Sequence, residues 1–440
     1  MSSPHHYPAA LTVTPFTGTL NATVAVPGSK SLTNRAMVLA AMSPRCTLTG
    51  ALQSEDTEVM IDCLRRLGWR VTEAWDRHEV TVERIDQQRE LKIPKAAAEL
   101  FVGNSGTTVR FLTAMLALGR GRYRLDGIPR MRERPIGDLL AALRQLGVTA
   151  ESESGSDCPP VVIESTGLRG GRIGVRADKS SQFLSALLLA LPFADGDTGV
   201  GIDGPMVSEP YIAMTLTLMK QCGLMVEVRD GGRTYYVPGK QAYAGGTIAI
   251  EPDASSASYW FAAAAITGGR VTVNGLTRES LQGDVAFVDY LEQMGCRVET
   301  CDQGITVHGR PLRGIDVDMN AISDTVMTLG AVAVYADGPT TIRNVGHIRH
   351  KETDRLSALA TELRRLGQDV DETEDAITIR PAPVRPAAVE TYNDHRMAMS
   401  LALVGLKSPG VTIKNPGCVV KTYPGYWDDF ERWLAPPVPT

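Results

Sequence analysis

The chain lacks most of the features that mark secreted, membrane and metal-binding proteins. Its seven cysteines among 440 residues are scattered and include no Cys-x-x-Cys pair. This argues against a disulfide framework or a zinc site and fits free thiols in a reducing compartment. No apolar run is long enough to span a bilayer, and the N-terminal segment shows no targeting pattern. We therefore expect a cytoplasmic protein without a membrane partner or a bound metal.

Several catalytic motifs are also missing. The sequence has no P-loop, no Gly-x-Ser-x-Gly nucleophile motif and no His-Glu-x-x-His metal motif. A glycine-rich stretch at 167–171 does not follow a strand-to-helix pattern, so it is weak support for a dinucleotide site. The net charge of −5 does not favour a nucleic-acid partner. The chemistry of the chain must therefore be sought in other residues.

What the sequence does contain is an internal repeat. Six glycines each close a short β-type run, and their spacing is about 77 residues in the first half and about 71 in the second. These glycines are Gly50, Gly127, Gly204, Gly275, Gly346 and Gly417. A fixed period of this kind predicts six copies of one structural unit, grouped as three plus three.

A second set of glycines keeps the same rhythm and ends helical patterns, where a left-handed cap is favoured. These are Gly68, Gly147, Gly223, Gly295 and Gly367. Together the two sets predict a unit that runs helix, strand, loop, helix, strand, hairpin strand. The first helix of each unit is apolar on nearly all sides and should be buried, whereas the second is more amphipathic and should lie outside it. The predicted fold class is α/β, an inside-out α/β barrel with buried helices and outer sheets.

The repeat also predicts the domain organisation. The period shortens between Gly204 and Gly275, and the glycine-rich segment 238–246 lies in that interval. We expect one domain of three units at 28–244 and a second at 1–27 plus 245–440, to which the N-terminal strand at 11–16 returns. A chain of 440 residues is long enough for two such domains.

Polar residues gather at the predicted starts of the six inner helices. Ser, Thr, Asn and Asp are ordinary helix caps, which accounts for most of them. Helix N-termini also carry unpaired N–H groups and a partial positive charge, so they attract anions. Six such ends, three from each domain, would make a positive cleft between the domains. We expect the active site in that cleft.

Basic residues at matching places in different units support an anion site, because the chain as a whole is acidic. They are Lys30, Arg35, Arg110, Arg134, Lys351, Arg355, Arg396 and Lys421. Asp324, Glu352 and His395 lie in the same segments and are candidates for acid–base catalysis. Structural ion pairing is an equally good interpretation of Glu352 and of the neighbouring Asp354 and Asp394. The pattern favours a small, multiply anionic ligand.

These segments together resemble the 5-enolpyruvylshikimate-3-phosphate synthase family of enolpyruvyl transferases. The resemblance covers about residues 12–435 and rests on 27–31 with 34–35, 103–108 with Arg110, 133–136, 180–183, 351–355, 393–398 and 421–424. It implies a two-domain enzyme of the shikimate pathway, which leads to chorismate and the aromatic amino acids. The enzyme would move the enolpyruvyl group of phosphoenolpyruvate to the 5-hydroxyl of shikimate 3-phosphate, through a tetrahedral intermediate, without a cofactor. We expect a monomer.

The resemblance also implies roles for individual residues. The catalytic residues would be Asp324, Glu352, Lys30 and His395, with Asp324 taking the proton of the 5-hydroxyl. Shikimate 3-phosphate would be held by Lys30, Ser31, Arg35, Ser180, Ser181, Gln182, Ser208, Tyr211, Asp324, His347 and Lys351. Phosphoenolpyruvate would be held by Lys30, Asn104, Gly106, Arg134, Gln182, Arg355, Arg396 and Lys421.

Two positions depart from the family pattern. Phe111 stands where many members have proline, and His347 stands where some have asparagine. Gly106 matches the glyphosate-sensitive form, so we expect inhibition by glyphosate. The alternative enzyme is the sister family that acts on UDP-N-acetylglucosamine, but it uses a cysteine on the loop near Arg134, and 127–135 contains none. The other alternative is a non-catalytic repeat protein that binds anions.

Overall fold

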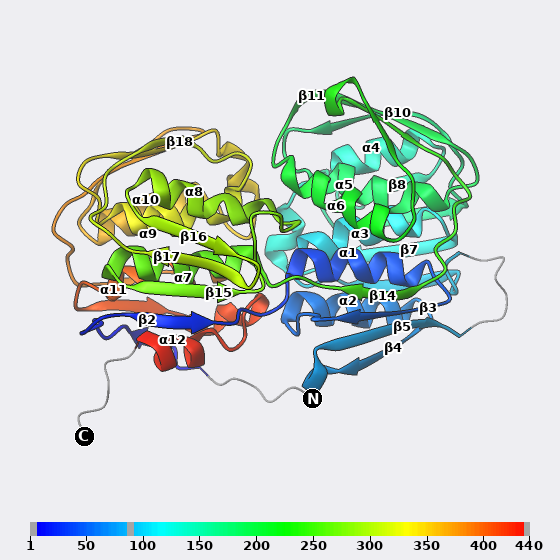
Figure 1. Ribbon diagram of the computed structural model, residues 1–440. Helices are drawn as coiled ribbons and strands as arrows, with labels where there is room; N and C mark the ends of the chain where they lie inside the picture. Colours follow the sequence, from blue (N-terminus) through cyan, green and yellow to red (C-terminus); the bar gives the residue numbers. More distant parts are fainter. Residues whose placement is uncertain (1–6, 86–91, 435–440) are drawn as a thin grey trace. The chain divides into compact units, whose positions relative to one another are not determined.

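The computed structural model describes residues 7–85 and 92–434 (Figure 1). The chain forms two compact units, one of Gly28–Ile250 and one of Met1–Pro27 with Glu251–Thr440. The second crossing therefore follows residue 250, not residue 244 as the sequence suggested. The reason is strand β14 (Gly246–Ala249), which pairs in parallel with β3 (Arg45–Thr49) and so belongs to the first half of the chain.

The described strands form six sheets, three in each unit, and five of them share one order. Four strands make each of these five: a parallel pair followed by an antiparallel hairpin. In unit 28–250 the sheets are β14-β3-β5-β4 with β5 Glu79–Arg84 and β4 Trp69–Ala74, β6-β7-β9-β8 (Ala97–Phe101, Arg120–Asp126, Val161–Thr166, Thr149–Ser152) and β10-β11-β13-β12 (Gly171–Ala177, Thr198–Met206, Thr234–Val237, Glu227–Arg229).

In the other unit the sheets are β2-β15-β17-β16 (Asn21–Val24, Arg270–Asn274, Gly304–His308, Arg297–Cys301), β18-β19-β21-β20 (Asp316–Asp318, Thr340–Arg343, Ile377–Arg380, Asp369–Glu372) and β22-β23-β1 (Ala387–Val389, Val411–Lys414, Ala10–Thr12).

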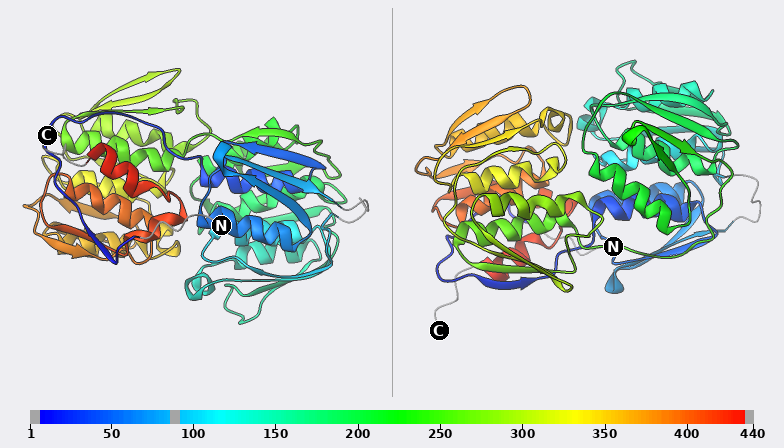
Figure 2. Two further views of the ribbon diagram at one scale, coloured as in Figure 1. Left: turned by 90° about the horizontal axis from the view of Figure 1, so that it is seen from below. Right: turned by 45° about the horizontal axis from the view of Figure 1, so that its top comes forward.

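The N-terminal segment completes two sheets of the later unit. Strand β2 pairs in parallel with β15, and β1 pairs antiparallel with β23, where the other sheets have their hairpin. The blue N-terminal strand accordingly lies beside later parts of the chain in both views of Figure 2. The return of the N-terminal strand to the later repeats, which the sequence suggested, is therefore seen in the strand pairing.

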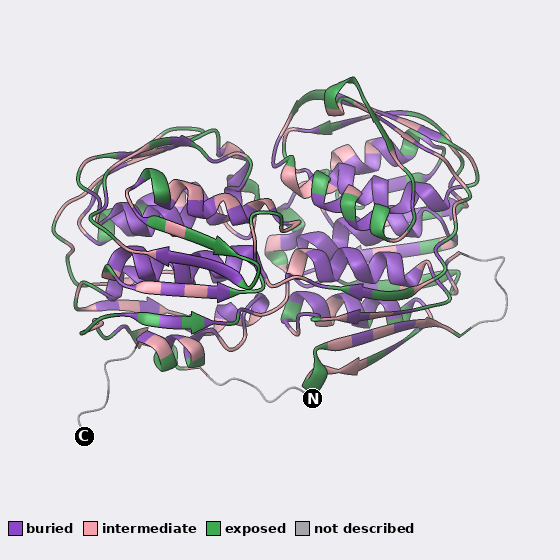
Figure 3. Ribbon diagram, viewed as in Figure 1, coloured by how far each residue is buried: buried purple, intermediate pink, exposed green. Residues whose placement is uncertain are grey.

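The first helix of each repeat is buried. These helices are α1 Lys30–Ala41, α3 Gly106–Leu116, α5 Gln182–Ala190, α7 Ala254–Thr267, α9 Val326–Ala333 and α11 His395–Gly405. Every residue of α3, α9 and α11 is buried, and within each unit the three inner helices contact one another. Figure 3 shows them in purple, with partly exposed strands around them. Helices apolar on all sides need such an interior.

The second helices present one face to solvent. They are α2 Glu55–Arg66, α4 Gly137–Gln145, α6 Pro210–Gln221, α8 Phe287–Gln293, α10 Arg355–Arg365 and α12 Tyr426–Leu434. Short 3-10 helices occupy Trp75–Arg77 (η1), Pro129–Glu133 (η2), Leu191–Phe193 (η3), Asp230–Gly232 (η4), Gly283–Ala286 (η5), Ser323–Thr325 (η6), Gly346–His350 (η7) and Pro416–Lys421 (η8). This order confirms the predicted α/β repeat.

The glycines after the outer helices adopt the left-handed conformation that the sequence predicted. The φ angles of Gly68 and Gly295 are +103° and +113°, values that side chains rarely adopt. In the last two repeats the residues with positive φ near the strand end are Asn344 and Asn415, two positions before the landmark glycine. Asparagine tolerates this conformation better than most residues. Within the described residues, no helix has the length and apolar character needed to cross a membrane.

Candidate functional site

Side chains cap four of the six inner helices, as the sequence predicted. Ser29 accepts from the backbone of α1, Ser105 from that of α3, Asp253 from that of α7 and Asp394 from that of α11. These caps satisfy one N–H group each and leave the other groups of the first turn available. The starts of the helices are therefore ordered without being filled by the caps.

The start of α3 brings together two of the cations predicted for unit 28–250, Arg110 and Arg134. Arg134 is buried, and its Nη1 donates to the backbone oxygen of Asn104 at 2.7 Å. Arg110 donates to the amide oxygen of Gln182 at 2.7 Å, which links α3 to the first residue of α5. A Cβ on Gly106 would lie 2.5 Å from Arg134 Nη2 and 3.1 Å from Arg110 Nη1. The absence of a side chain at Gly106 thus lets two guanidinium groups approach the helix start.

Arg35 has a structural position that the sequence did not show. It is 1% exposed, and its guanidinium donates to Thr215 Oγ1 at 2.7 Å and to the backbone oxygen of Ser31 at 3.0 Å. Its guanidinium carbon lies 5.0 Å from the centre of the Phe111 ring, which is a cation–π contact. Burial lowers the pKa of Arg35 to about 10. Phe111, the departure from the family pattern, is therefore a packing partner of Arg35.

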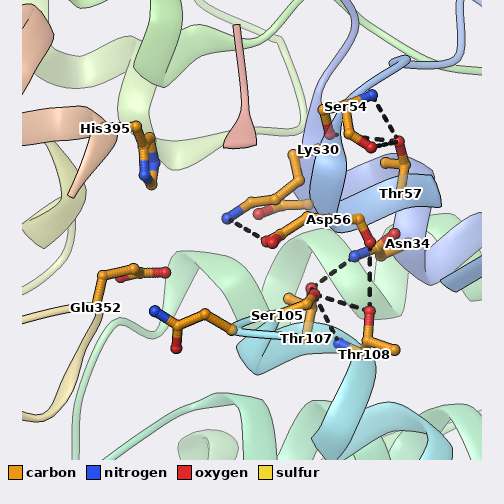
Figure 4. A network of polar contacts seen from close by, with 12 residues as sticks. Lys30, Asn34, Ser54, Asp56, Thr57, Ser105, Thr107, Thr108, Glu352 and His395 are labelled. Carbon is orange, nitrogen blue, oxygen red and sulfur yellow. Dashed lines mark hydrogen bonds and ion pairs between the residues drawn. The ribbon is translucent and has the colours of Figure 1, made fainter. Parts of the chain in front are cut away.

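Lys30 is the first residue of α1, and its ammonium lies 3.5 Å from a carboxylate oxygen of Asp56 (Figure 4). Ser31 follows it on the same helix. The other polar residues predicted for this unit lie at two further helix starts. Ser180, Ser181 and Gln182 open α5, while Ser208 and Tyr211 open α6. Ser208 has a φ of +54°, an uncommon conformation for serine that marks a closely defined turn.

In the other unit, one carboxylate binds three cations. Asp324, in η6, accepts from Lys351 Nζ at 2.6 Å and from Arg355 Nη1 at 3.1 Å. Its second oxygen accepts from Arg396 Nη2 at 2.8 Å. Lys351, Arg355 and Arg396 come from two different repeats. The structure therefore brings together Asp324, Lys351, Arg355 and Arg396, which the sequence selected from separate segments of the chain.

Arg355 is held by two further carboxylates. It is 1% exposed, and its Nε lies 2.7 Å from Asp394 Oδ2, while its Nη2 lies 2.8 Å from Glu352 Oε2. Asp394 also caps α11 by accepting from the backbone N–H of Arg396. The charges of this cluster balance, with three carboxylates and three cations. Buried charges are tolerated only when they are paired in this way.

The remaining predicted residues of this unit lie close by. His395 is completely buried, and its Nδ1 lies 3.6 Å from Asp394 Oδ1, too far for a hydrogen bond. Lys421 is 4% exposed and ends η8, which packs against α11. The catalytic role of His395 and the binding role of Lys421 stay predictions.

Burial and positive charge affect the ionisation of two neighbours. Burial lowers the pKa of Lys351, against the opposing effect of Asp324. Burial also lowers the pKa of His347 to about 3, and the charge of Lys351 adds to this effect. His347 is therefore a neutral imidazole at physiological pH, able to donate and accept one hydrogen bond each.

Comparison with known proteins identifies the family. The model of the family described as EPSP synthase (3-phosphoshikimate 1-carboxyvinyltransferase) matches residues 16–430. The chain belongs to the EPSP synthase family. A relative from Nostoc punctiforme named 3-phosphoshikimate 1-carboxyvinyltransferase is 49% identical and is matched over 94% of this chain and 97% of the relative. A chloroplastic relative of the same name from Brassica napus is 46% identical, over 93% of this chain and 82% of its own length.

A solved structure supports the same assignment. The EPSP synthase from Acinetobacter baumannii has a TM-score of 0.79 and 26% sequence identity to this chain, and the match covers 97% of this chain and 98% of that one. The family resemblance inferred from the motifs and the α/β fold are thereby confirmed. The similarity spans both units rather than one of them.

Three contacts around the candidate site were not predicted from the sequence. Asp56 contacts Lys30, Arg110 holds Gln182, and Asp394 holds Arg355. The repeat offered a signal for Asp56, because it follows Gly50 by six residues, as Glu352 follows Gly346. The sequence indicates Arg110 and Asp394 as charged residues of these segments. Their partners depend on side-chain directions that a sequence does not show.

The ionisation of His347 predicts a dependence of stability on pH. Its folded pKa of about 3 is lower than the usual value of 6.5, so the unfolded chain binds more protons between these limits. The free energy of unfolding should therefore fall as the pH drops below about 6.5, by up to about 1.4 kcal/mol per pH unit from this residue. His347→Asn should reduce that fall. The measurement is the free energy of unfolding in urea at several pH values between about 4 and 7.

The control for this prediction is His78→Asn. His78 is exposed and has a φ of +53°, which asparagine tolerates. It should leave the slope of stability against pH unchanged. An equal slope in wild type and His347→Asn would contradict the prediction.

Proposed function

We infer that this protein transfers the enolpyruvyl group of phosphoenolpyruvate to the 5-hydroxyl of shikimate 3-phosphate and releases phosphate. The observation that carries the inference is the match to 3-phosphoshikimate 1-carboxyvinyltransferases along nearly the whole chain, at 45–49% identity in bacterial relatives. The buried cations at the helix starts supply the second support, because both substrates carry several negative charges.

Phosphoenolpyruvate would be bound by arginines and lysines at the helix starts. Arg134 at the start of α3, and Arg355 and Arg396 around Asp324, are each buried and already oriented by protein acceptors. Guanidinium groups fixed in this way bind carboxylates and phosphates in pairs of parallel hydrogen bonds. Lys30, Asn104, Gly106, Gln182 and Lys421 complete the proposed set.

Shikimate 3-phosphate would be bound largely by hydroxyl groups. Ser31, Ser180, Ser181 and Ser208 lie at or just before helix starts, where a phosphate is also favoured by the helix dipole. In unit 28–250 the guanidinium of Arg35 donates to acceptors of the protein itself. Its proposed contribution is therefore to fix the backbone of Ser31. Gln182, Tyr211, His347, Lys351, Lys30 and Asp324 complete the set.

The reaction proceeds by addition and then elimination. Protonation of the methylene carbon of phosphoenolpyruvate leaves positive charge on its neighbouring carbon, which the 5-hydroxyl oxygen attacks while the hydroxyl proton passes to a base. The adduct then loses phosphate from that carbon and a proton from the new methyl group, which restores the double bond. We propose Asp324 as the base for the hydroxyl proton. Glu352, Lys30 and His395 would share the transfers to and from carbon.

The three cations around Asp324 bear on this role. A carboxylate that accepts from Lys351, Arg355 and Arg396 is a weak base, because its negative charge is stabilised. When these cations bind the carboxylate or phosphate of a substrate, they withdraw part of that stabilisation. Substrate binding would thus raise the proton affinity of Asp324 at the step that needs it.

The two alternatives are less well supported. Transfer to UDP-N-acetylglucosamine is not favoured by the names of the relatives, and the loop 127–135 contains no cysteine. A non-catalytic anion-binding protein would not need carboxylates among its cations, yet Asp324, Glu352 and Asp394 lie there. We further propose that one chain carries the activity alone, in the cytoplasm.

A direct assay tests the proposed function. The purified protein is mixed with phosphoenolpyruvate and either shikimate 3-phosphate or UDP-N-acetylglucosamine, and phosphate release is measured at several protein concentrations. We expect release with shikimate 3-phosphate alone, at a specific activity that does not depend on protein concentration. Release only with the rival acceptor, or with neither, would refute the assignment.

The geometry at Gly106 generates a second prediction. In Gly106→Ala, the new methyl group must displace the guanidinium of Arg134, since the two would otherwise lie 2.5 Å apart. We expect a KM for phosphoenolpyruvate raised by about tenfold or more, with a smaller change in the KM for shikimate 3-phosphate. Glyphosate should inhibit the wild type and should inhibit the variant less.

The matched control is Gly199→Ala in β11. The nearest atom to a Cβ at Gly199 is 3.8 Å away, an ordinary contact, and this glycine does not have a positive φ. It should leave both KM values unchanged. An unchanged KM for phosphoenolpyruvate in Gly106→Ala would show that Arg134 does not bind it.

A further inference from the structure

Lys30 and Asp56 form an ion pair between the starts of two helices. The ammonium of Lys30 and Oδ2 of Asp56 are 3.5 Å apart, and their side chains are 11% and 2% exposed (Figure 4). A flexible lysine side chain loses much conformational freedom when it is held in one place. The lysine therefore needs a rigid partner if it is to be held in one place.

The start of α2 is built as such a partner. Asp56 is the second residue of α2, and the preceding cap is closed by mutual bonds between Ser54 and Thr57. Thr57 Oγ1 also donates to the backbone oxygen of Leu52 at 2.8 Å. The N–H of Leu52 in turn donates to Thr33 Oγ1 on α1. The first turns of α1 and α2 are thus joined by hydrogen bonds through the backbone of Leu52.

Helix α3 is tied to the same network. The hydroxyl of Thr108 donates to the backbone oxygen of Asp56 at 3.5 Å, and Asn34 Nδ2 donates to Thr107 Oγ1 at 2.7 Å. Figure 4 shows these contacts on one side of the Lys30–Asp56 pair. Hydrogen bonds from three helix starts therefore fix the backbone that carries the Asp56 carboxylate.

The charge of Asp56 is favoured even without the lysine. Asp56 lies in the first turn of α2 with Glu55 and Glu58, where the helix dipole stabilises negative charge. Lys30 has no comparable support from α1, because the N-terminal end of a helix disfavours a cation. The carboxylate of Asp56 offsets this unfavourable position of the lysine.

We propose that Asp56 is a positioning residue, which fixes the ammonium of Lys30 at the start of α1 for its contact with phosphoenolpyruvate. The inference rests on the proposed function for the identity of that substrate, but the contact itself is a property of this chain. In this proposal Asp56 acts through Lys30 and not on the substrate itself. It also explains how a lysine can act at a helix end that does not favour it.

The first test needs no substrate. Asp56→Asn keeps the shape of the side chain and removes its charge, and limited reductive methylation followed by peptide mass spectrometry reports the reactivity of Lys30. We expect Lys30 to be methylated several-fold faster in the variant, since an amine released from its ion pair moves more freely and is reached more easily by the reagent. Asp62→Asn is the control, because Asp62 lies on the same helix but is exposed and pairs with Arg66. An equal rate in wild type and Asp56→Asn would overturn the proposal, whatever reaction the protein catalyses.

The second test uses the phosphate-release assay. Asp56→Asn should retain the wild-type melting temperature within a few degrees but should lower kcat/KM for phosphoenolpyruvate by about tenfold to hundredfold. Asp56→Glu should restore part of it. In a Lys30→Ala background, Asp56→Asn should cost nothing further, because the group it positions is gone. An equal loss in both backgrounds would show a merely structural role and overturn the proposal. An inactive wild type with an altered Lys30 reactivity would refute the proposed function alone.

Discussion

The site depends on one constraint, which is that buried charge must be paired before it can be used. Arg355 is 1% exposed and would be unstable there without Asp324, Glu352 and Asp394. The same constraint holds for Lys30 with Asp56 in the other unit. Arg355 and Lys30 therefore each have carboxylates that keep them oriented, and an anionic substrate would meet groups that need little further ordering.

The repeated fold is what makes this pairing possible. Each repeat buries an apolar inner helix, completely so for α3, α9 and α11, and the polar start of such a helix needs partners for its N–H groups. Neighbouring repeats supply those side chains, as when Arg355 of one repeat holds Asp394 at the cap of the next inner helix. Arg35 likewise links α1, α5 and α6, because it donates to Ser31, Ser185 and Thr215. Because Asp394, Ser185 and Thr215 lie on other repeats than the arginines that they bind, the packing of the helices fixes the geometry of the charges.

The sequence was sufficient to predict the repeat and the segments that carry the candidate site residues, because both follow from local rules. The cap glycines such as Gly68 need a positive φ, and the inner helices are apolar on all sides, so position along the chain predicts their place in the fold. The crossing after residue 250 was missed because β14 is assigned by its pairing with β3, a long-range contact. The sequence also did not predict which cations pair with Asp324 or which acceptors bind Arg35. Both depend on side chains from different repeats meeting in space.

The most direct measurement is the affinity of Asp324→Asn for phosphoenolpyruvate, determined by calorimetry and compared with wild type. In this account the Asp324 carboxylate and phosphoenolpyruvate compete for Arg355 and Arg396. The isosteric amide should therefore bind phosphoenolpyruvate at least as tightly as wild type, while turnover falls by about a hundredfold or more. Weaker binding with a normal melting temperature would contradict the account, because it would mean that the carboxylate does not compete with the substrate for these cations.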